Sequence, residues 1–120
     1  MISHDTQIRV LYRDTDKMGV VYHANYIVYY EAARNEMFRS IGLPYTELES
    51  MNIAMPIVEV ESKYKAPAFY DELLTVRATM KELPAVRAIV EYEVYMFWHF
   101  KICYAYNLSA YRTALIASGA

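Results

Sequence analysis

A segment near the amino terminus combines two carboxylates, a glycine and a histidine directly before a helical pattern. Asp14 and Asp16 come first, Gly19 follows, and His23 stands two residues before Asn25, where the helical pattern begins. The start of a helix carries unpaired backbone N–H groups and a partial positive charge. A carbonyl oxygen held there would be polarised while a nearby carboxylate attacks the carbon or directs water. The segment therefore predicts a site for chemistry at a carbonyl group.

The elements on either side of this segment can be predicted from apolar periodicity. Alternation from Gln7 to Leu11 predicts a short strand. From Asn25, apolar residues recur at helical spacing as far as Ile41, and Gly42 supplies the left-handed position that typically ends a helix. The first half of this helix is apolar on most sides, so we expect a central helix enclosed by other elements.

The remaining pattern is that of a sheet. One or two helical turns are expected between Pro44 and Ser50, and from Ile57 the apolar period becomes two. Strands with one apolar face are predicted over 57–65, 74–81 and 86–94. One strand, one buried helix and several antiparallel strands make an α+β layer fold. With 120 residues and no linker or repeat, we expect a single domain over 1–120.

Composition excludes several classes of function. Twelve basic and fourteen acidic residues give a net charge of −2 with no basic block, which argues against a nucleic-acid partner. Cys103 is the only cysteine, so an internal disulfide is excluded and a reducing, cytoplasmic location is expected. No signal-peptide pattern opens the chain, and no apolar run approaches the ~20 residues that a membrane span requires.

Three motifs resemble those of the hotdog-fold acyl-CoA thioesterases. They are Asp14 to Tyr26, then Glu31 to Arg34 with Ile41 and Gly42, and finally Tyr64 to Leu73. The chain is most similar to the 4-hydroxybenzoyl-CoA thioesterase-like family, in its Tol-Pal-associated branch. The resemblance implies a long central helix wrapped by a curved antiparallel sheet. It also implies a homodimer or homotetramer with the active site at the interface between protomers.

The resemblance covers about residues 8 to 95 and ends near Met96. Segment 96–120 departs from the family pattern, because no turn residue follows the last predicted strand. Residues 104–120 could still supply a final strand, with Tyr106 and Leu108 on one face.

The resemblance implies roles for residues of the first motif. Asp16 would act as nucleophile, or as general base for water, in the hydrolysis of an acyl-CoA to free acid and CoA. The backbone N–H of His23 would polarise the thioester carbonyl, and its imidazole would orient the carbonyl or assist proton transfer. Gly19 would let the backbone approach the ligand closely. The other expected substrate-binding residues of this motif are Val21, Tyr22 and Asn25.

Several of these residues also have a purely structural interpretation. Asp14 would cap the turn through its side chain, and Tyr22 would pack. Asn25 is expected as the N-cap of the helix rather than as a catalyst. Glu31 would pair with Arg34 or Asn35 at helical spacing.

Three cations of the strands could contact the phosphates of CoA, whereas the Asp-rich loop does not fit a metal site. Lys63, Lys65 and Arg77 are candidates for the phosphates of CoA through charge-assisted hydrogen bonds, or else they are ordinary solvated strand residues. A calcium loop is rejected because Met18 and Asn25 occupy positions that require oxygen ligands, among them a bidentate glutamate. We expect no metal and no cofactor.

Two other functions remain open at this point. The chain could be a non-catalytic module that binds acyl-CoA or acyl carrier protein, and an acyl carrier protein could equally be the thioester donor of the enzyme. A hotdog dehydratase is a weaker alternative, because Asp16 and His23 share one loop before the helix, as in the thioesterases.

Overall fold

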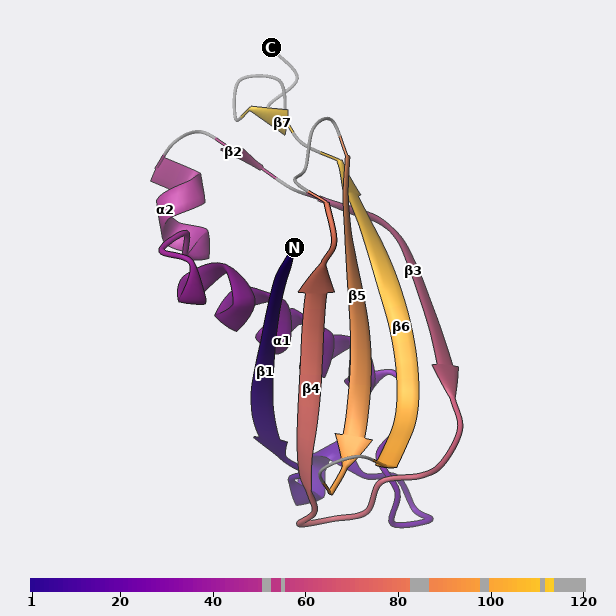
Figure 1. Ribbon diagram of the computed structural model, residues 1–120. Helices are drawn as coiled ribbons and strands as arrows, with labels where there is room; N and C mark the ends of the chain where they lie inside the picture. The colour runs from indigo at the N-terminus through magenta and orange to yellow at the C-terminus, as the bar shows by residue number, and fades with distance from the viewer. Residues whose placement is uncertain (51–52, 55, 83–86, 98–99, 111, 114–120) are drawn as a thin grey trace.

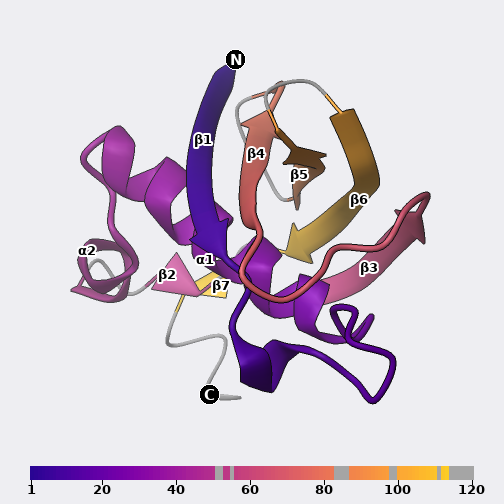
Figure 2. The ribbon, with the colours of Figure 1, turned by 90° about the horizontal axis from the view of Figure 1, so that it is seen from below.

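The computed structural model describes residues 1–50, 53–54, 56–82, 87–97, 100–110 and 112–113. Within these residues, one long helix lies against the concave side of a five-stranded antiparallel sheet (Figure 1). The sheet consists of β1 (Ile2–Arg9), β3 (Ile57–Tyr64), β4 (Leu73–Met80), β5 (Arg87–Met96) and β6 (Phe100–Ala110). Its order is β1-β4-β5-β6-β3, which makes β1 and β3 the edge strands. Seen from below, the sheet curves around the helix (Figure 2), which confirms the predicted hotdog architecture.

The long helix, α1 (Asn25–Ser40), begins and ends close to the predicted positions. Its buried residues are Tyr26, Tyr29, Tyr30, Ala33, Met37 and Phe38. Gly42 follows at φ +81°, and its N–H donates to the Arg39 carbonyl at 3.0 Å. Leu43 N–H donates to the Phe38 carbonyl at 2.9 Å. These bonds satisfy carbonyls that the helix end would otherwise leave open, as the glycine predicted.

Strands β4 and β5 supply the sheet side of the core. Their alternate residues are buried: Leu74, Val76, Ala78, Met80, Ala88, Val90, Tyr92 and Val94. The rings of Tyr30 and Tyr92 stack with centroids 4.7 Å apart, which joins helix to sheet. The predicted apolar face of β3 is not buried in this way, since Val58 is 58% and Val60 39% exposed. The reason is position: β3 pairs with β6 and stands at the edge of the sheet.

Strand β1 is longer than predicted. It starts at Ile2 rather than Gln7, because it pairs with β4 along its whole length, from Ile2 opposite Met80 to Arg9 opposite Leu73. The polar residues of its first half lie in this ladder, where backbone pairing rather than apolar alternation defines the strand.

The carboxy-terminal region completes the sheet. Strand β6 starts at Phe100, four residues before the predicted segment, and lies between β5 and β3. Phe97, at φ +58°, takes the left-handed position of the turn that a glycine or asparagine usually fills. Tyr106 and Leu108 share the outer face, as predicted, while Asn107 and Ser109 are buried.

Two short elements lie outside this sheet. Helix α2 (Tyr45–Ser50) is the predicted helical segment after Pro44. Beyond it, β2 (Ile53–Ala54) pairs with β7 (Arg112–Thr113). The predicted strand position Val86 and the last residues, 114–120, lie outside the described part of the chain.

Candidate functional site

The loop that carries Asp16 is fastened to the rest of the molecule by backbone bonds. After β1 the chain makes a 3-10 turn, η1 (Tyr12–Asp14). Val21 N–H donates to the Ala68 carbonyl at 2.9 Å, and Asp16 N–H donates to the Val20 carbonyl at 2.9 Å. Both ends of the loop are therefore fixed before the helix starts.

Asp16 is the first residue of a tight turn, and one oxygen of its carboxylate accepts a hydrogen bond within that turn. Gly19 N–H donates to the Asp16 carbonyl at 3.0 Å, and Met18 N–H donates to Asp16 Oδ1 at 2.8 Å. The side chain is exposed, and among the described residues no donor reaches Oδ2. One carboxylate oxygen thus anchors the group while the other is available to a substrate or water, which is the arrangement a nucleophile or base requires.

Gly19 has a conformational role in this turn. Its φ is +80°, and a Cβ built on it would meet nothing within 4 Å. The glycine is thus required by the left-handed conformation of the turn, and the structure shows no crowding that would require the absence of a side chain.

The start of α1 differs from the prediction for Asn25. Asn25 N–H donates to the Tyr22 carbonyl at 2.9 Å, and Ala24, at φ −66° and ψ −24°, occupies the cap position in a helical conformation. The N-cap prediction for Asn25 is wrong because the chain already turns helically before it. Its side-chain amide instead donates to the Asp14 carbonyl at 2.8 Å and ties the helix to the loop.

His23 presents an unused amide at this helix start. Among the described residues its N–H has no acceptor, while its carbonyl accepts the hydroxyl of Tyr64 at 3.1 Å. Its ring lies 4.5 Å from that of Tyr22 and 6.4 Å from that of Tyr64, centroid to centroid. The free N–H is the kind of donor that stabilises an oxyanion.

Asp14 holds loop and helix together. Its Oδ2 accepts Leu11 N–H at 2.9 Å and the Tyr29 hydroxyl at 2.8 Å, which confirms the predicted capping role. Its carbonyl accepts Tyr22 N–H at 2.9 Å in addition to the amide of Asn25. Burial, together with Asp14, raises the pKa of Tyr29, so that the phenol remains a donor.

A cavity of about 520 Å³ lies beside Asp16. It is lined by Tyr12, Arg13, Thr15, Asp16, Lys17, Tyr22 and Asn25. Three of the predicted site residues therefore meet here, namely Asp16, Tyr22 and Asn25. Val21 does not, because its side chain is only 6% exposed and belongs to the core. Gly19 and His23 do not line this cavity either.

Two cations of this cavity, Arg13 and Lys17, were not singled out from the sequence. Both are exposed and flank the aspartate pair in the chain. Their position within the first motif, next to Asp14 and Asp16, was the sequence feature that could have identified them.

The three cations predicted from the sequence to bind CoA lie elsewhere in the structure. Arg77 is engaged by Asp5, with its Nε 2.8 Å from Oδ1 and its Nη2 3.1 Å from Oδ2. Lys63 Nζ lies 3.9 Å from a Glu61 oxygen, and Lys65 Nζ lies 5.2 Å from the ring centroid of Tyr104. None of the three cations lines the cavity beside Asp16.

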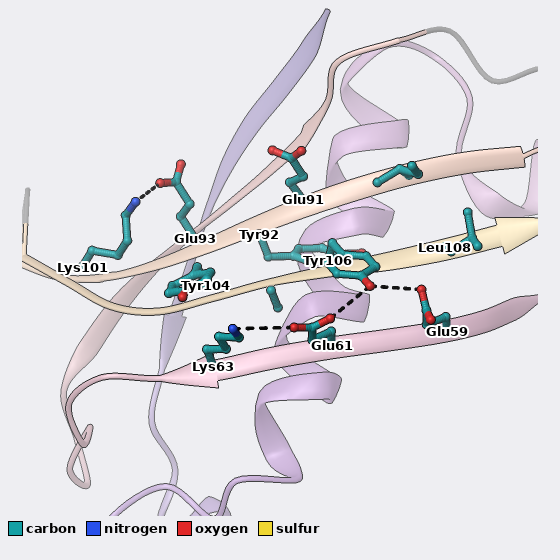
Figure 3. A pocket seen from close by; sticks show the side chains of 12 residues that line it. Glu59, Glu61, Lys63, Glu91, Tyr92, Glu93, Lys101, Tyr104, Tyr106 and Leu108 are labelled. Atoms are coloured by element: carbon teal, nitrogen blue, oxygen red, sulfur yellow. Dashed lines mark hydrogen bonds and ion pairs between the residues drawn. The ribbon is translucent and has the colours of Figure 1, made fainter.

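A second hollow lies on the outer face of β3, β5 and β6 (Figure 3). Its volume is about 580 Å³, and its carboxylates come from Glu59, Glu61, Glu91 and Glu93. Tyr106 donates its hydroxyl to Glu59 at 3.0 Å and to Glu61 at 3.1 Å, and Lys101 pairs with Glu93. Lys63 and Lys101 also line the hollow, but four carboxylates against two ammonium groups leave its lining with a net negative charge. A net negative charge repels phosphates, so we do not assign this hollow to CoA.

The described residues contain neither a metal-binding cluster nor a membrane-spanning helix. No group of three or more His, Cys, Asp or Glu side chains there is placed to hold a metal ion. No helix in that part of the chain has the length and apolar character needed to cross a membrane.

Comparison with known proteins identifies the family. The model of the thioesterase-like superfamily matches residues 10–103, which extends the likeness into β6. YbgC of Helicobacter pylori (strain 26695), named an acyl-CoA thioesterase, is 40% identical over 88 residues, covering 72% of this chain and 63% of that protein. YneP of Bacillus subtilis is 33% identical over 89 residues, covering 74% of this chain and 64% of YneP. The aligned region thus spans less than two thirds of either relative.

The fold agrees with a solved relative. The structure of a DHNA-CoA thioesterase from Staphylococcus aureus matches with a TM-score of 0.88 and 28% identity, covering 95% of this chain and 76% of that one. Fold, motif and sequence match agree, and the chain belongs to the thioesterase-like superfamily, with its hotdog fold.

Proposed function

We propose that the protein is an acyl-CoA thioesterase that converts an acyl-CoA and water to a free acid and CoA. The observation that carries this proposal is the exposed Asp16 carboxylate, with one oxygen free, on the loop leading to the open His23 amide at the start of α1. The name of the H. pylori relative and the superfamily match support the same reaction.

The chemistry requires an activated oxygen and a donor for the developing negative charge. In the general-base route, Asp16 takes a proton from water as the water oxygen adds to the thioester carbon. The carbonyl oxygen becomes an oxyanion that accepts a hydrogen bond from His23 N–H. When the intermediate collapses, the C–S bond breaks, and the proton held by Asp16 neutralises the departing thiolate.

The nucleophilic route uses the same residues. The free oxygen of Asp16 would add to the carbon, the C–S bond would break, and water would then hydrolyse the acyl anhydride formed on Asp16. The two routes differ in the source of the oxygen. A single turnover in ¹⁸O-water places the label in the acid by the general-base route, and in either the acid or Asp16 by the nucleophilic route.

Arg13 and Lys17 are our candidates for the phosphates of CoA. They line the cavity that contains Asp16, and both are exposed. A guanidinium and an ammonium can hold phosphates through charge-assisted hydrogen bonds. An acyl carrier protein, whose thioester ends in the same kind of arm, is an alternative donor for this site.

We also propose a homodimer or homotetramer, as the resemblance implies. Edge strand β3 has an open backbone side and exposes Ile57, Val58 and Val60. An apolar edge strand of this kind is suited to pairing with another chain. A second protomer on β3 would lie close to Tyr64 and His23, and so to the start of α1.

The test is thiol release from a panel of short, long and aromatic acyl-CoAs, with wild type and Asp16→Asn side by side. We expect turnover by wild type and a loss of at least ~100-fold in the variant, which remains folded and still binds substrate. Wild-type rates in the variant would remove Asp16 from the mechanism. Tight binding of every donor by folded wild type without thiol release would instead establish a non-catalytic binding module.

A further inference from the structure

Arg34 on α1 is a half-buried cation without a carboxylate partner among the described residues. Its Nη1 donates to the Tyr92 hydroxyl at 3.2 Å and to Asn107 Oδ1 at 3.4 Å. Glu31 was expected to pair with Arg34 or Asn35, but within the described part of the chain it forms neither an ion pair with Arg34 nor a hydrogen bond with Asn35, so that expectation is wrong. The cation has turned toward the sheet instead.

Both partners of Arg34 are neutral. Tyr92 is 1% and Asn107 2% exposed, and the Tyr92 hydroxyl donates to Asn107. Burial raises the pKa of Tyr92, so the phenol stays uncharged at neutral pH. A guanidinium is always charged, and dipoles alone compensate its desolvation incompletely. The site therefore favours an anion as an additional partner.

A cavity of about 250 Å³ adjoins this cation. Its apolar lining includes Phe38 from the helix, Ile57 from β3 and Val90 from β5, and its polar lining includes Arg34 and Ser109. Glu31 also lines the cavity, but its side chain is exposed and forms no ion pair with Arg34 in the described part of the chain. The Ser109 side chain is buried, and its oxygen accepts the amide of Asn107 at 3.3 Å. Its own O–H therefore remains as a donor. Arg34 and Ser109 are thus two donors beside apolar side chains, while the carboxylate of Glu31 is exposed, and this combination suits a small anion held against Arg34.

The cavity lies further along α1, toward the end of the helix, than the proposed reaction centre at His23. Strand β3 follows the helix in the opposite direction: Tyr64, at its end, bonds the His23 carbonyl, and Ile57, at its beginning, shares the cavity with Arg34. Arg34 comes 11 residues after His23, which is about 16 Å along a helix. Exposed apolar side chains occur on both elements between these points: Ile27, Val28, Val58 and Val60.

We propose that the cavity at Arg34 binds a carboxylate at the far end of the acyl group, so that the protein favours acyl-CoAs whose chain ends in a carboxylate. The thioester would lie at His23 and the chain would follow the apolar strip between α1 and β3. This inference rests on the proposed function, and its test separates the two.

The experiment compares pairs of acyl-CoAs with the same number of chain atoms, ending in either a methyl group or a carboxylate. Affinity is measured by calorimetry with Asp16→Asn, and kcat/KM with wild type. At chain lengths that reach Arg34, we expect about tenfold tighter binding of the carboxylate member and a similar preference in kcat/KM. Equal affinity for both members at every length would overturn the proposal, whether or not either is hydrolysed.

Three variants in the Asp16→Asn background locate the preference. Arg34→Gln should abolish it. Asn35→Asp adds a negative charge to the wall of the cavity without removing a bond of Arg34, and should reduce it even if Arg34→Gln does not fold. Arg39→Gln changes an exposed cation of the same helix, paired with Glu36, and should retain it.

A preference that survives both cavity substitutions would place the anion elsewhere and overturn the assignment. Hydrolysis of both members without a preference would leave the thioesterase and remove the carboxylate site. Tighter binding of the carboxylate member without hydrolysis of either member would support the carboxylate site and contradict the proposed thioesterase activity.

Discussion

The phenol of Tyr29 on α1 donates a 2.8 Å hydrogen bond to the carboxylate of Asp14, fifteen residues earlier in the chain. The same Asp14 oxygen accepts Leu11 N–H. This contact fixes the start of α1 relative to the turn that precedes Asp16. It therefore helps to set the position of the Asp16 carboxylate relative to the His23 N–H.

Removing this contact should destabilise the protein by a predictable amount. Tyr29→Phe should cost about 1 kcal/mol and Asp14→Ala about 2 kcal/mol, because the alanine also leaves Leu11 N–H without its acceptor. Urea unfolding of both single variants and the double variant measures the coupling. Strictly additive effects would show that the hydrogen bond contributes nothing to stability.

Gly19 offers a test of backbone conformation. Because its φ is +80° and a Cβ would meet nothing, Gly19→Ala should cost about 1–2 kcal/mol through conformation alone. Gly19→Asn should cost less, since asparagine tolerates this region. Thermal unfolding compares the two variants, and an asparagine variant no more stable than the alanine variant would contradict the explanation.

Substitutions of His23 can distinguish the catalytic contribution of its imidazole from that of its backbone N–H. His23→Ala retains the N–H, so we expect a fall in kcat smaller than the ~100-fold expected for Asp16→Asn. His23→Pro removes the N–H at a helix start, where proline is tolerated, and should lose more than the alanine variant. Rates are measured after circular dichroism has shown both variants folded. An alanine variant as inactive as Asp16→Asn would give the imidazole the main role.

The phosphate contacts can be assigned by comparing cations. Arg13→Gln and Lys17→Gln should each raise KM for acyl-CoA several-fold, because both cations line the cavity with Asp16. Arg77→Gln should leave KM unchanged, since its guanidinium is paired with Asp5 on another part of the protomer. KM values at low and moderate salt check this, and a raised KM in Arg77→Gln alone would restore the role predicted from the sequence.

Stability should fall at alkaline pH. Burial raises the pKa of Tyr26 from its ordinary value of 10.0 to about 12. Between these values the unfolded chain releases the phenolic proton while the folded protein keeps it, so the stabilisation is complete below pH 10 and declines toward pH 12. Tyr26→Phe should flatten this decline in urea unfolding, whereas Tyr12→Phe, at a residue 78% exposed, should not. A Tyr26→Phe profile parallel to wild type would be inconsistent with this explanation.

The sequence predicted those features that depend on periodicity or on a single conformational requirement. The buried alternation of β4 and β5, the helix stop at Gly42 and the capping by Asp14 are of this kind. Sequence-based prediction failed where a feature depends on contacts with residues distant in the chain. The exposure of β3 follows from its edge position. The two hydrogen-bond partners of Arg34, Tyr92 and Asn107, lie 58 and 73 residues away in the sheet. The cap at Asn25 was missed because the helical turn starts earlier, through Ala24.

The position of β6 between β5 and β3 also has a consequence for synthesis. Within the described sheet, β3 has β6 as its one neighbour, and the ribosome makes β3 about forty residues before β6. Until β6 emerges and pairs, β3 has no place in the sheet, and the strip between β3 and α1 does not exist. Non-local pairing of this kind is slow. The surface on which an acyl chain would lie is therefore completed only after β6 has been made.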